Sequence, residues 1–189
     1  TDHSYDEEPA LGSLLVARDL PDSGGDTWFV SMADAWTRLP ARIQRTLLSL
    51  SAVHSSKHVF GSRWAWAKRL IGADGLTNNP QLADALDDVV HPAVITHPLS
   101  GRPTLYVNPG FTVGFAGWSL LRSAPLLAYL YRHATRPQHI AKFRWAPGSV
   151  VLWDNRATWH YARNDYHGQQ RRMHRITIDG CALAAHRVL

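Results

Sequence analysis

Two stretches near the end of the sequence carry residue types that can do chemistry together. His160 closes a polar corner, residues 154–157, that follows an apolar run. Arg171 and Arg175 come next, and on a strand they would share one face with Met173, because side chains alternate between faces. Guanidinium groups gathered with an imidazole inside a protein need partners, since an unpaired buried charge is very costly. The pattern therefore predicts a site that binds a small anion and, beside it, a metal ion.

Short strands with turns between them must position these residues. Periodicity and turn residues predict strands over residues 11–18, 28–31, 93–96, 104–107, 140–145, 149–153 and 172–179. A turn with Gly24 and Gly25 joins the first two, which indicates a hairpin-like unit of an antiparallel sheet. Helices are expected at residues 34–39, capped by Asp34, at 41–50 and at 119–134. This pattern predicts a mainly β chain with flanking helices, arranged as a double-sheet jelly roll.

One segment departs from the β pattern. Residues 61–90 combine tryptophans, basic residues and an acidic amphipathic stretch, and no clear strand fits them. Such a stretch between ordered elements is typical of a lid or a mobile insert. The sequence contains no internal repeat and no low-complexity segment, so residues 1–189 are expected to form a single domain.

The overall charge does not require a nucleic-acid partner. The formal net charge is +5 and the isoelectric point is about 9.7, yet the basic residues are scattered, with the densest group at residues 169–175. A small-anion site accounts for that group better than a phosphate-tracking stripe does. The single cysteine, Cys181, gives no disulfide framework and suits a reducing compartment. No apolar run approaches the roughly 18 residues of a membrane span, so we expect a cytoplasmic protein without a membrane partner.

Six segments, in a fixed order, resemble those of one enzyme family. They are Thr1-Asp2, Leu20-Pro21 with Gly24 to Thr27, His97-Pro98 with Ser100-Gly101, Tyr106-Val107-Asn108, Trp153 to Arg156 with His160, and Arg171 to Arg175. Together they resemble the taurine dioxygenase/2,4-dichlorophenoxyacetate dioxygenase family of 2-oxoglutarate-dependent oxygenases. Asp2 precedes Thr27 by 25 positions and Arg171 follows His160 by 11, and both spacings fit the family motif. The resemblance runs from the first residue to about Gly180 and implies a double-stranded β-helix, which is a jelly roll.

The resemblance implies an iron(II) site held by two histidines and one carboxylate. Asp2 matches the carboxylate and His160 matches the second histidine. The first histidine of the family's His-x-Asp motif would stand one residue before Thr1, so we expect the chain to lack an N-terminal portion that carries it. Such a facial triad leaves open positions on the metal for 2-oxoglutarate and O₂. Asp2 by itself would be a solvated residue, and only its spacing from Thr27 and His160 makes it a candidate ligand.

The resemblance also assigns the remaining candidate binding residues. Arg171 would bind the distal carboxylate of 2-oxoglutarate with two parallel hydrogen bonds, and the Thr27 hydroxyl would bind the same group. Arg175 would bind an anionic group of the primary substrate. Further pocket residues would be Phe60, Tyr106, Asn108 and Phe111, although aromatic residues on strands are core residues by default.

His3 has two interpretations. Its backbone N–H would reach the substrate anion, while its side chain, as the next residue after Asp2 on a strand, would point to the opposite face. A pairing of His3 with Asp6 in a separate metal site is the poorer interpretation.

These assignments predict an enzyme, an Fe(II)- and 2-oxoglutarate-dependent dioxygenase that hydroxylates a small organic substrate, with succinate and CO₂ as co-products. Arg175 favours an anionic substrate such as a sulfonate, an alkyl sulfate or an aryloxyalkanoate. Two alternatives stay open: a non-catalytic jelly-roll module that binds an anion, and a metal-dependent hydrolase on a cupin-like barrel. Family members are commonly dimers or tetramers, so we expect a homo-oligomer in which residues 1–189 form one catalytic domain.

Overall fold

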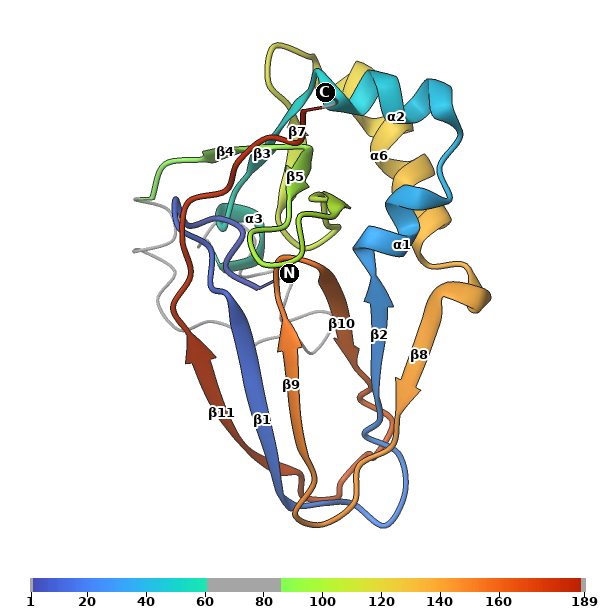
Figure 1. Cartoon of the computed structure of the whole chain (residues 1–189). Helices are drawn as coiled ribbons and strands as arrows, with labels where there is room; N and C mark the ends of the chain where they lie inside the picture. Colours follow the sequence, from blue (N-terminus) through green and yellow to red (C-terminus); the bar gives the residue numbers. More distant parts are fainter. Residues whose placement is uncertain (1, 61–85, 188–189) are drawn as a thin grey trace.

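The computed structural model describes residues 2–60 and 86–187, which form a mainly β structure with a few helices. In the lower part of Figure 1 two three-stranded antiparallel sheets stand beside each other. One sheet contains, in spatial order, β11 (Arg172–Ile178), β1 (Gly12–Asp19) and β9 (Val150–Asp154). The other contains β10 (Thr158–Ala162), β2 (Thr27–Ser31) and β8 (Ile140–Phe143). The prediction of a mainly β chain with flanking helices is confirmed.

The predicted pairing of the first two strands is wrong. β1 pairs with β11 and β9, whereas β2 pairs with β10 and β8, so the two strands belong to different sheets. The connection between them spans residues 20–26. Hairpin loops usually have only about 2–5 residues, and this longer loop instead carries the chain from one sheet to the other. Gly24 and Gly25 make the turn with φ of 81° and 72°, in the left-handed region that favours glycine.

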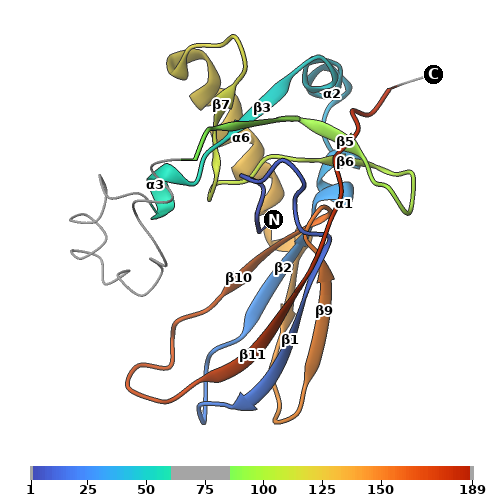
Figure 2. The same ribbon diagram turned by 90° about the vertical axis from the view of Figure 1, so that its left-hand side faces the viewer.

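Smaller sheets and helices cap the two large sheets, as Figure 2 shows from the side. One small sheet contains β4 (Val89–Pro92), β3 (Ser51–His54) and β7 (Thr112–Phe115), and the other pairs β5 (Val94–Thr96) with β6 (Pro103–Leu105). The sequence reading omitted β3, β7 and β10. No strand was expected in residues 61–90, and this expectation is wrong at residues 89 and 90, where β4 begins. Residues 61–85, which carry the rest of that prediction, lie outside the described residues.

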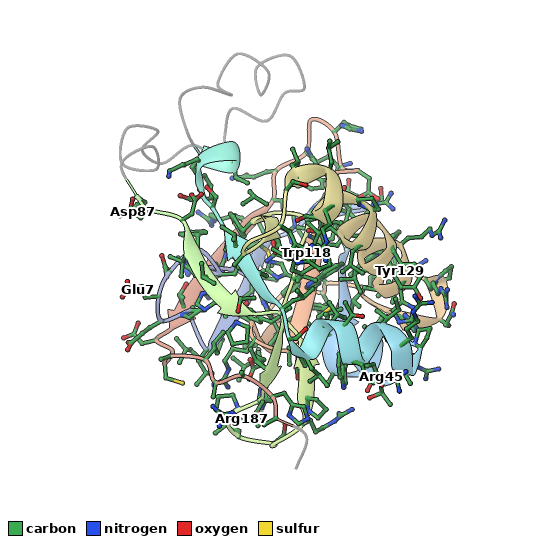
Figure 3. All side chains as sticks on the ribbon, turned by 90° about the horizontal axis from the view of Figure 1, so that it is seen from above. Glu7, Arg45, Asp87, Trp118, Tyr129 and Arg187 are labelled. Atoms are coloured by element: carbon green, nitrogen blue, oxygen red, sulfur yellow. The ribbon has the colours of Figure 1, made fainter. Side chains whose placement is uncertain are left out.

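The longer helices lie close to their predicted positions. They are α1 (Met32–Thr37), α2 (Ala41–Leu48) and α6 (Leu120–Ala134), with the short α3 (Lys57–Phe60) and η3 (Pro137–His139) in addition. The predicted cap of α1 is wrong, because the Ser31 hydroxyl, not Asp34, accepts a hydrogen bond from the first turn, at 3.2 Å from the Asp34 N–H. Figure 3, viewed from above, shows Arg45 of α2 and Tyr129 of α6 on the same side of the molecule. No helix in the described ranges is both long and apolar enough to cross a membrane.

Strands β2 and β10 separate the hydrophobic core from the polar residues. Trp159 lies opposite Val30 in the ladder, and His160 lies opposite Phe29. Since neighbouring side chains on a strand point to opposite faces, these two pairs occupy opposite faces of the sheet. Val30 and Trp159 belong to the main hydrophobic cluster, which is completed by buried residues such as Met32, Leu47, Leu105 and Leu130. The side chain of His160 lies on the other face of the sheet.

Gly180 provides a test of how the end of β11 packs. A Cβ built there would lie 1.7 Å from the Pro9 carbonyl oxygen and 3.0 Å from the Leu11 nitrogen, both backbone atoms. We expect Gly180→Ala to lower the free energy of unfolding by about 1–3 kcal/mol, because the chain segments must move apart. The matched control is Gly114→Ala, whose Cβ would meet only the Ser123 side chain at 3.4 Å. Urea titrations followed by circular dichroism measure the free energy of unfolding of both variants. Equal losses of that free energy in the two variants would contradict this packing.

Candidate active site

Two side chains from distant parts of the chain meet at the Asp2 carboxylate. The Asp2 Oδ2 atom lies 3.5 Å from the Nε2 of His160 on β10. The same oxygen accepts a hydrogen bond from the Nη2 of Arg175 on β11, and this Nη2 also donates to the Ser13 hydroxyl at 2.8 Å. The His160 ring packs against Trp153, with 4.8 Å between ring centroids. The fold therefore brings together Asp2, His160 and Arg175.

The environment sets the protonation of this pair. Burial lowers the pKa of His160 to about 4, against the opposing effect of the Asp2 carboxylate. Burial alone would raise the pKa of Asp2, but His160 and Arg175 outweigh it and hold that pKa below its ordinary value. At neutral pH the site thus presents a neutral imidazole and an ionised carboxylate, which are the forms that bind metal ions. This donor set fits a metal ion, although within residues 2–60 and 86–187 no three such side chains gather into a complete metal site.

A buried ion pair fixes the corner that precedes β10. Asp154 Oδ1 accepts hydrogen bonds from the backbone N–H and the Nε of Arg156, at 2.8 and 3.0 Å, and Oδ2 accepts from Nη2 at 2.7 Å. His97 donates to the same Oδ2 at 2.9 Å. Asn155 donates to the Ser13 hydroxyl at 3.1 Å, and Ser13 in turn contacts Arg175. Asp154 and Asn155 therefore fix this corner through their side chains.

Two nitrogen atoms of the Arg171 guanidinium have no hydrogen-bond partner among the described residues. They are the buried Nε and Nη2 atoms of this side chain. Its guanidinium carbon lies 5.9 Å from the centroid of Trp145, and the indole N–H of Trp145 donates to the Thr27 hydroxyl at 2.9 Å. Thr27 is buried and its hydroxyl hydrogen is still able to donate. Arg171 and Thr27 therefore flank one tryptophan, and an anion bound there would satisfy the unpaired guanidinium.

Gly25 allows this arginine to approach the loop that precedes β2. A Cβ at Gly25 would lie 3.2 Å from both Cδ and Nε of Arg171. Together with the positive φ of Gly25, this contact explains why the Gly-Gly turn precedes Thr27 in the sequence.

His3 does not lie on a strand, so the expected orientation of its side chain is wrong. His3 has a φ of 61°, in a turn, and its Nδ1 lies 2.9 Å from the Asp6 carboxylate. This hydrogen bond with Asp6 raises the pKa of His3, against the effect of burial. The two residues do pair, but in the part of the chain that the structure describes no third ligand joins them in a separate metal site.

The aromatic candidates gather near this turn. Tyr5 contacts Phe111 and Phe60, with ring centroids at 4.8 and 5.9 Å, and the two phenylalanines are 6.0 Å apart. Tyr106 is fully buried and packs against His54 and His91, as a core residue does. The sequence reading did not select Tyr5, although its position three residues after Asp2 was a usable signal.

Hydrogen bonds to other residues of the chain hold the Asn108 side chain in place. Its side-chain carbonyl accepts from the Phe111 N–H at 2.7 Å, and its amide donates to the Ser4 hydroxyl at 2.9 Å. Ser4 and its other partner, His54, were also missed, because no local pattern connects residues that lie fifty positions apart.

A cavity of about 550 Å³ adjoins Asp2 and His160. Its remaining lining is mostly apolar and comes from β2, β10, the loop after β6, the end of α6 and the start of β8: Trp28, Val30, Asn108, Pro109, Gly110, Phe111, Thr135, Ile140, Trp159 and Tyr161. Arg171, Thr27 and Arg175 are not among the lining residues.

The fold is mainly β, and it places a carboxylate and a neutral imidazole near two arginines that have donors free for an anion. These features define a class of protein: a candidate metalloenzyme for small anionic ligands. The chain belongs to the family described as "Taurine catabolism dioxygenase TauD, TfdA family", which it matches over residues 1–177.

Relatives with assigned names support the family. The chain is 35% identical over 181 residues to the alpha-ketoglutarate-dependent sulfate ester dioxygenase of Pseudomonas putida, covering 95% of this chain and 58% of that protein. It is 33% identical over 169 residues to the alkylsulfatase of Acinetobacter baylyi, covering 89% of this chain and 52% of that protein. The chain therefore spans between half and three-fifths of the length of these two relatives.

Solved structures agree in fold. A taurine dioxygenase from Burkholderia xenovorans superposes with a TM-score of 0.80 at 30% identity, over 98% of this chain and 57% of that one. A protein named AAD-2, solved in complex with Mn(II) and N-oxalylglycine, also gives a TM-score of 0.80, at 28% identity, over 97% of this chain and 68% of that one.

The burial of His54 predicts a loss of stability in acid. Burial lowers the pKa of His54 from 6.5 to about 3, so between these values the unfolded chain binds a proton that the folded chain excludes. The free energy of unfolding should therefore fall as the pH drops below about 6.5, by up to about 1.4 kcal/mol per pH unit from this group. Replacing the ring by a neutral amide, His54→Asn, should make the slope shallower. Unfolding titrations from pH 7 to 4 measure how steeply the free energy of unfolding depends on pH. An equally steep dependence in His54→Asn would contradict the role given to His54.

Proposed function

We propose that the protein is an Fe(II)- and 2-oxoglutarate-dependent dioxygenase that hydroxylates a small anionic substrate. The observation that carries the proposal is the buried guanidinium of Arg171, which has two unpaired nitrogen atoms among the described residues of a chain that belongs to this family. A buried cation of this kind requires an anion, and the distal carboxylate of 2-oxoglutarate matches its planar donor fork.

Asp2 and His160 would hold the iron. Their ionisation states suit the role, and their facing atoms, Oδ2 and Nε2, are 3.5 Å apart. A third protein ligand, expected from the family motif as a histidine one position before Thr1, would complete the triad. Bound iron(II), together with 2-oxoglutarate and O₂, would supply the oxidation of a substrate C–H bond, with succinate and CO₂ as co-products.

The remaining residues would bind and orient the reactants. Arg171 and the Thr27 hydroxyl would hold the distal carboxylate of 2-oxoglutarate, while Trp145 keeps Thr27 in place through its indole N–H. Arg175 uses only its Nη2 in the contacts with Asp2 and Ser13. Its Nε and Nη1 donors are left to bind an anionic group of the substrate.

The substrate would be a sulfonate, an alkyl sulfate or an aryloxyalkanoate. Relatives named as a sulfate ester dioxygenase and a 2,4-dichlorophenoxyacetate dioxygenase support these classes. Hydroxylation of the carbon that bears a sulfate ester oxygen would break that C–O bond and release sulfate and an aldehyde. Phe60 and Phe111, with Tyr5, would contact the organic part of the substrate. Two of the predicted pocket residues would act less directly, His3 through its backbone N–H and Asn108 by holding Ser4 and Phe111.

The same proposal covers the fold, the oligomeric state, the location and the partners of the protein. The two three-stranded sheets support a double-stranded β-helix, in which residues 1–189 act as one catalytic domain. Exposed Val150, Leu152 and Ile176 of one large sheet support a homo-oligomer, a dimer or a tetramer. The single cysteine supports a cytoplasmic location, and basic residues engaged in ion pairs, such as Arg102 and Arg172, support a small-molecule partner and not a nucleic acid or a membrane.

An anaerobic titration tests the function. Fe(II) and 2-oxoglutarate, added without oxygen to the protein at its natural length, should produce a visible charge-transfer band when the 2-oxo acid chelates the metal. Addition of O₂ and an alkyl sulfate should then yield succinate. A non-catalytic anion-binding module would give no band, and a metal-dependent hydrolase would release sulfate without O₂ and 2-oxoglutarate. Either result would remove the dioxygenase assignment.

Arg171 is the most direct residue to change. Arg171→Ala should weaken the binding of 2-oxoglutarate by about 1.5–3 kcal/mol, roughly 10- to 150-fold, because a charge-assisted pair is lost. The binding of the metal should change far less. Isothermal titration with Mn(II) and 2-oxoglutarate separates the two affinities.

The neighbouring Arg172 gives the matched control. Its side chain is exposed and its Nε donates to Asp19 at 2.7 Å. Arg172→Ala should leave the affinity for 2-oxoglutarate within about twofold, since exposed ion pairs contribute little. Equal effects of the two substitutions would show that Arg171 does not bind the co-substrate.

A further inference from the structure

The turn that carries Asp2 belongs to no helix or strand. β1 begins only at Gly12, and His3 already has a φ of 61°. The Asp6 N–H donates to the His3 carbonyl at 3.0 Å, which closes a tight turn over residues 3–6. The position of the Asp2 carboxylate therefore depends on whatever holds this turn.

Ser4 anchors the turn from behind. It is fully buried, and its hydroxyl oxygen lies 3.1 Å from Nδ1 of His54 and 2.9 Å from the side-chain amide of Asn108. Burial lowers the pKa of His54 to about 3, so its ring is neutral at ordinary pH. One hydroxyl can therefore donate to the ring nitrogen and accept from the amide at the same time.

Both partners of Ser4 are themselves fixed. His54 lies on β3, whose ladder with β4 and β7 is complete on both sides. Asn108 donates through its backbone N–H to the Thr112 hydroxyl at 2.9 Å, and Tyr131 donates to its carbonyl at 3.0 Å. At the other end of the turn, His91 of β4 contacts the Asp6 carbonyl through Nε2 at 2.9 Å.

We propose that Ser4 is a positioning residue, which transmits the fixed places of His54 and Asn108 to the Asp2 carboxylate two residues away. The proposal rests on the metal-binding role proposed for Asp2. Without the hydroxyl, the amide of Asn108 loses its partner and Nδ1 of His54 keeps only the longer contact with the Thr112 hydroxyl, at 3.4 Å. The turn then shifts to satisfy these groups, and Asp2 moves with it. Outer contacts of this kind are typically worth about 10–100-fold in metal affinity.

The test compares two buried serines in the protein at its natural length. Ser4→Ala removes the anchor, and Ser123→Ala removes a hydroxyl of equal burial that accepts from the Phe115 N–H at 3.1 Å in another part of the fold. The melting temperature of the metal-free protein and the dissociation constant for Mn(II) are measured for both. We expect similar losses in melting temperature, but a rise of about 10–100-fold in the Mn(II) dissociation constant for Ser4→Ala alone.

If Ser4 has a purely structural role, Ser4→Ala lowers the melting temperature but binds Mn(II) as tightly as Ser123→Ala does. That result would overturn the proposal. If Ser4→Ala does not fold, Asn108→Ala, which keeps the contact between Ser4 and His54, must weaken Mn(II) binding in the same way. Asp2→Ala separates this proposal from the function. Loss of Mn(II) binding in Asp2→Ala with normal binding in Ser4→Ala removes only the positioning role. Unchanged binding in Asp2→Ala removes both.

Discussion

The approach of the Asp2 carboxylate to the His160 imidazole is the contact on which the rest of the site depends. Neither group could be placed there by its own segment: Asp2 lies in a turn, and His160 lies in the middle of a short strand. β10 turns His160 away from the hydrophobic cluster, and Ser4, two residues after Asp2, is hydrogen-bonded to His54 and Asn108. Arg175 then neutralises the carboxylate from a second sheet.

The same constraint explains how the structure distributes its polar groups. The interior contains several buried polar side chains, among them Arg156, His54, His91 and Asn108. Such groups are tolerated when they are hydrogen-bonded, and each of these has a partner that fixes a backbone segment next to the site. Among the described residues, buried nitrogen atoms without a hydrogen-bond partner occur in the rings of His54, His133 and His160 and in Arg171. Of these four side chains, Arg171 alone is always charged, so its two unpaired nitrogen atoms suit an anionic ligand.

The sequence predicted those parts of the fold that local patterns encode. Strands β1, β2, β9 and β11 and helices α2 and α6 follow apolar periodicity and were found within a few residues. β3 and β7 were missed because their alternation is short and their residues, such as His54 and Gly114, are not typical of strands. The pairing of β1 with β2 was wrong because residues 20–26 carry the chain from one sheet to the other, which the Gly-Gly turn signal does not distinguish from a hairpin. The site residues came from spacing and resemblance, and their roles stay predictions, whereas Ser4 and Tyr5 depend on partners that only the folded chain brings near.

The contact between Asp2 and Arg175 joins residues 173 positions apart, and this separation has a consequence for the order of folding. Long-range contacts close slowly because the chain must lose the entropy of a large loop before they form. The hydrophobic cluster around β2, β10 and α6 includes many contacts between residues closer in sequence, so we expect it to form before Asp2 reaches His160 and Arg175. The site is then assembled at a late stage of folding, on a framework that is already in place.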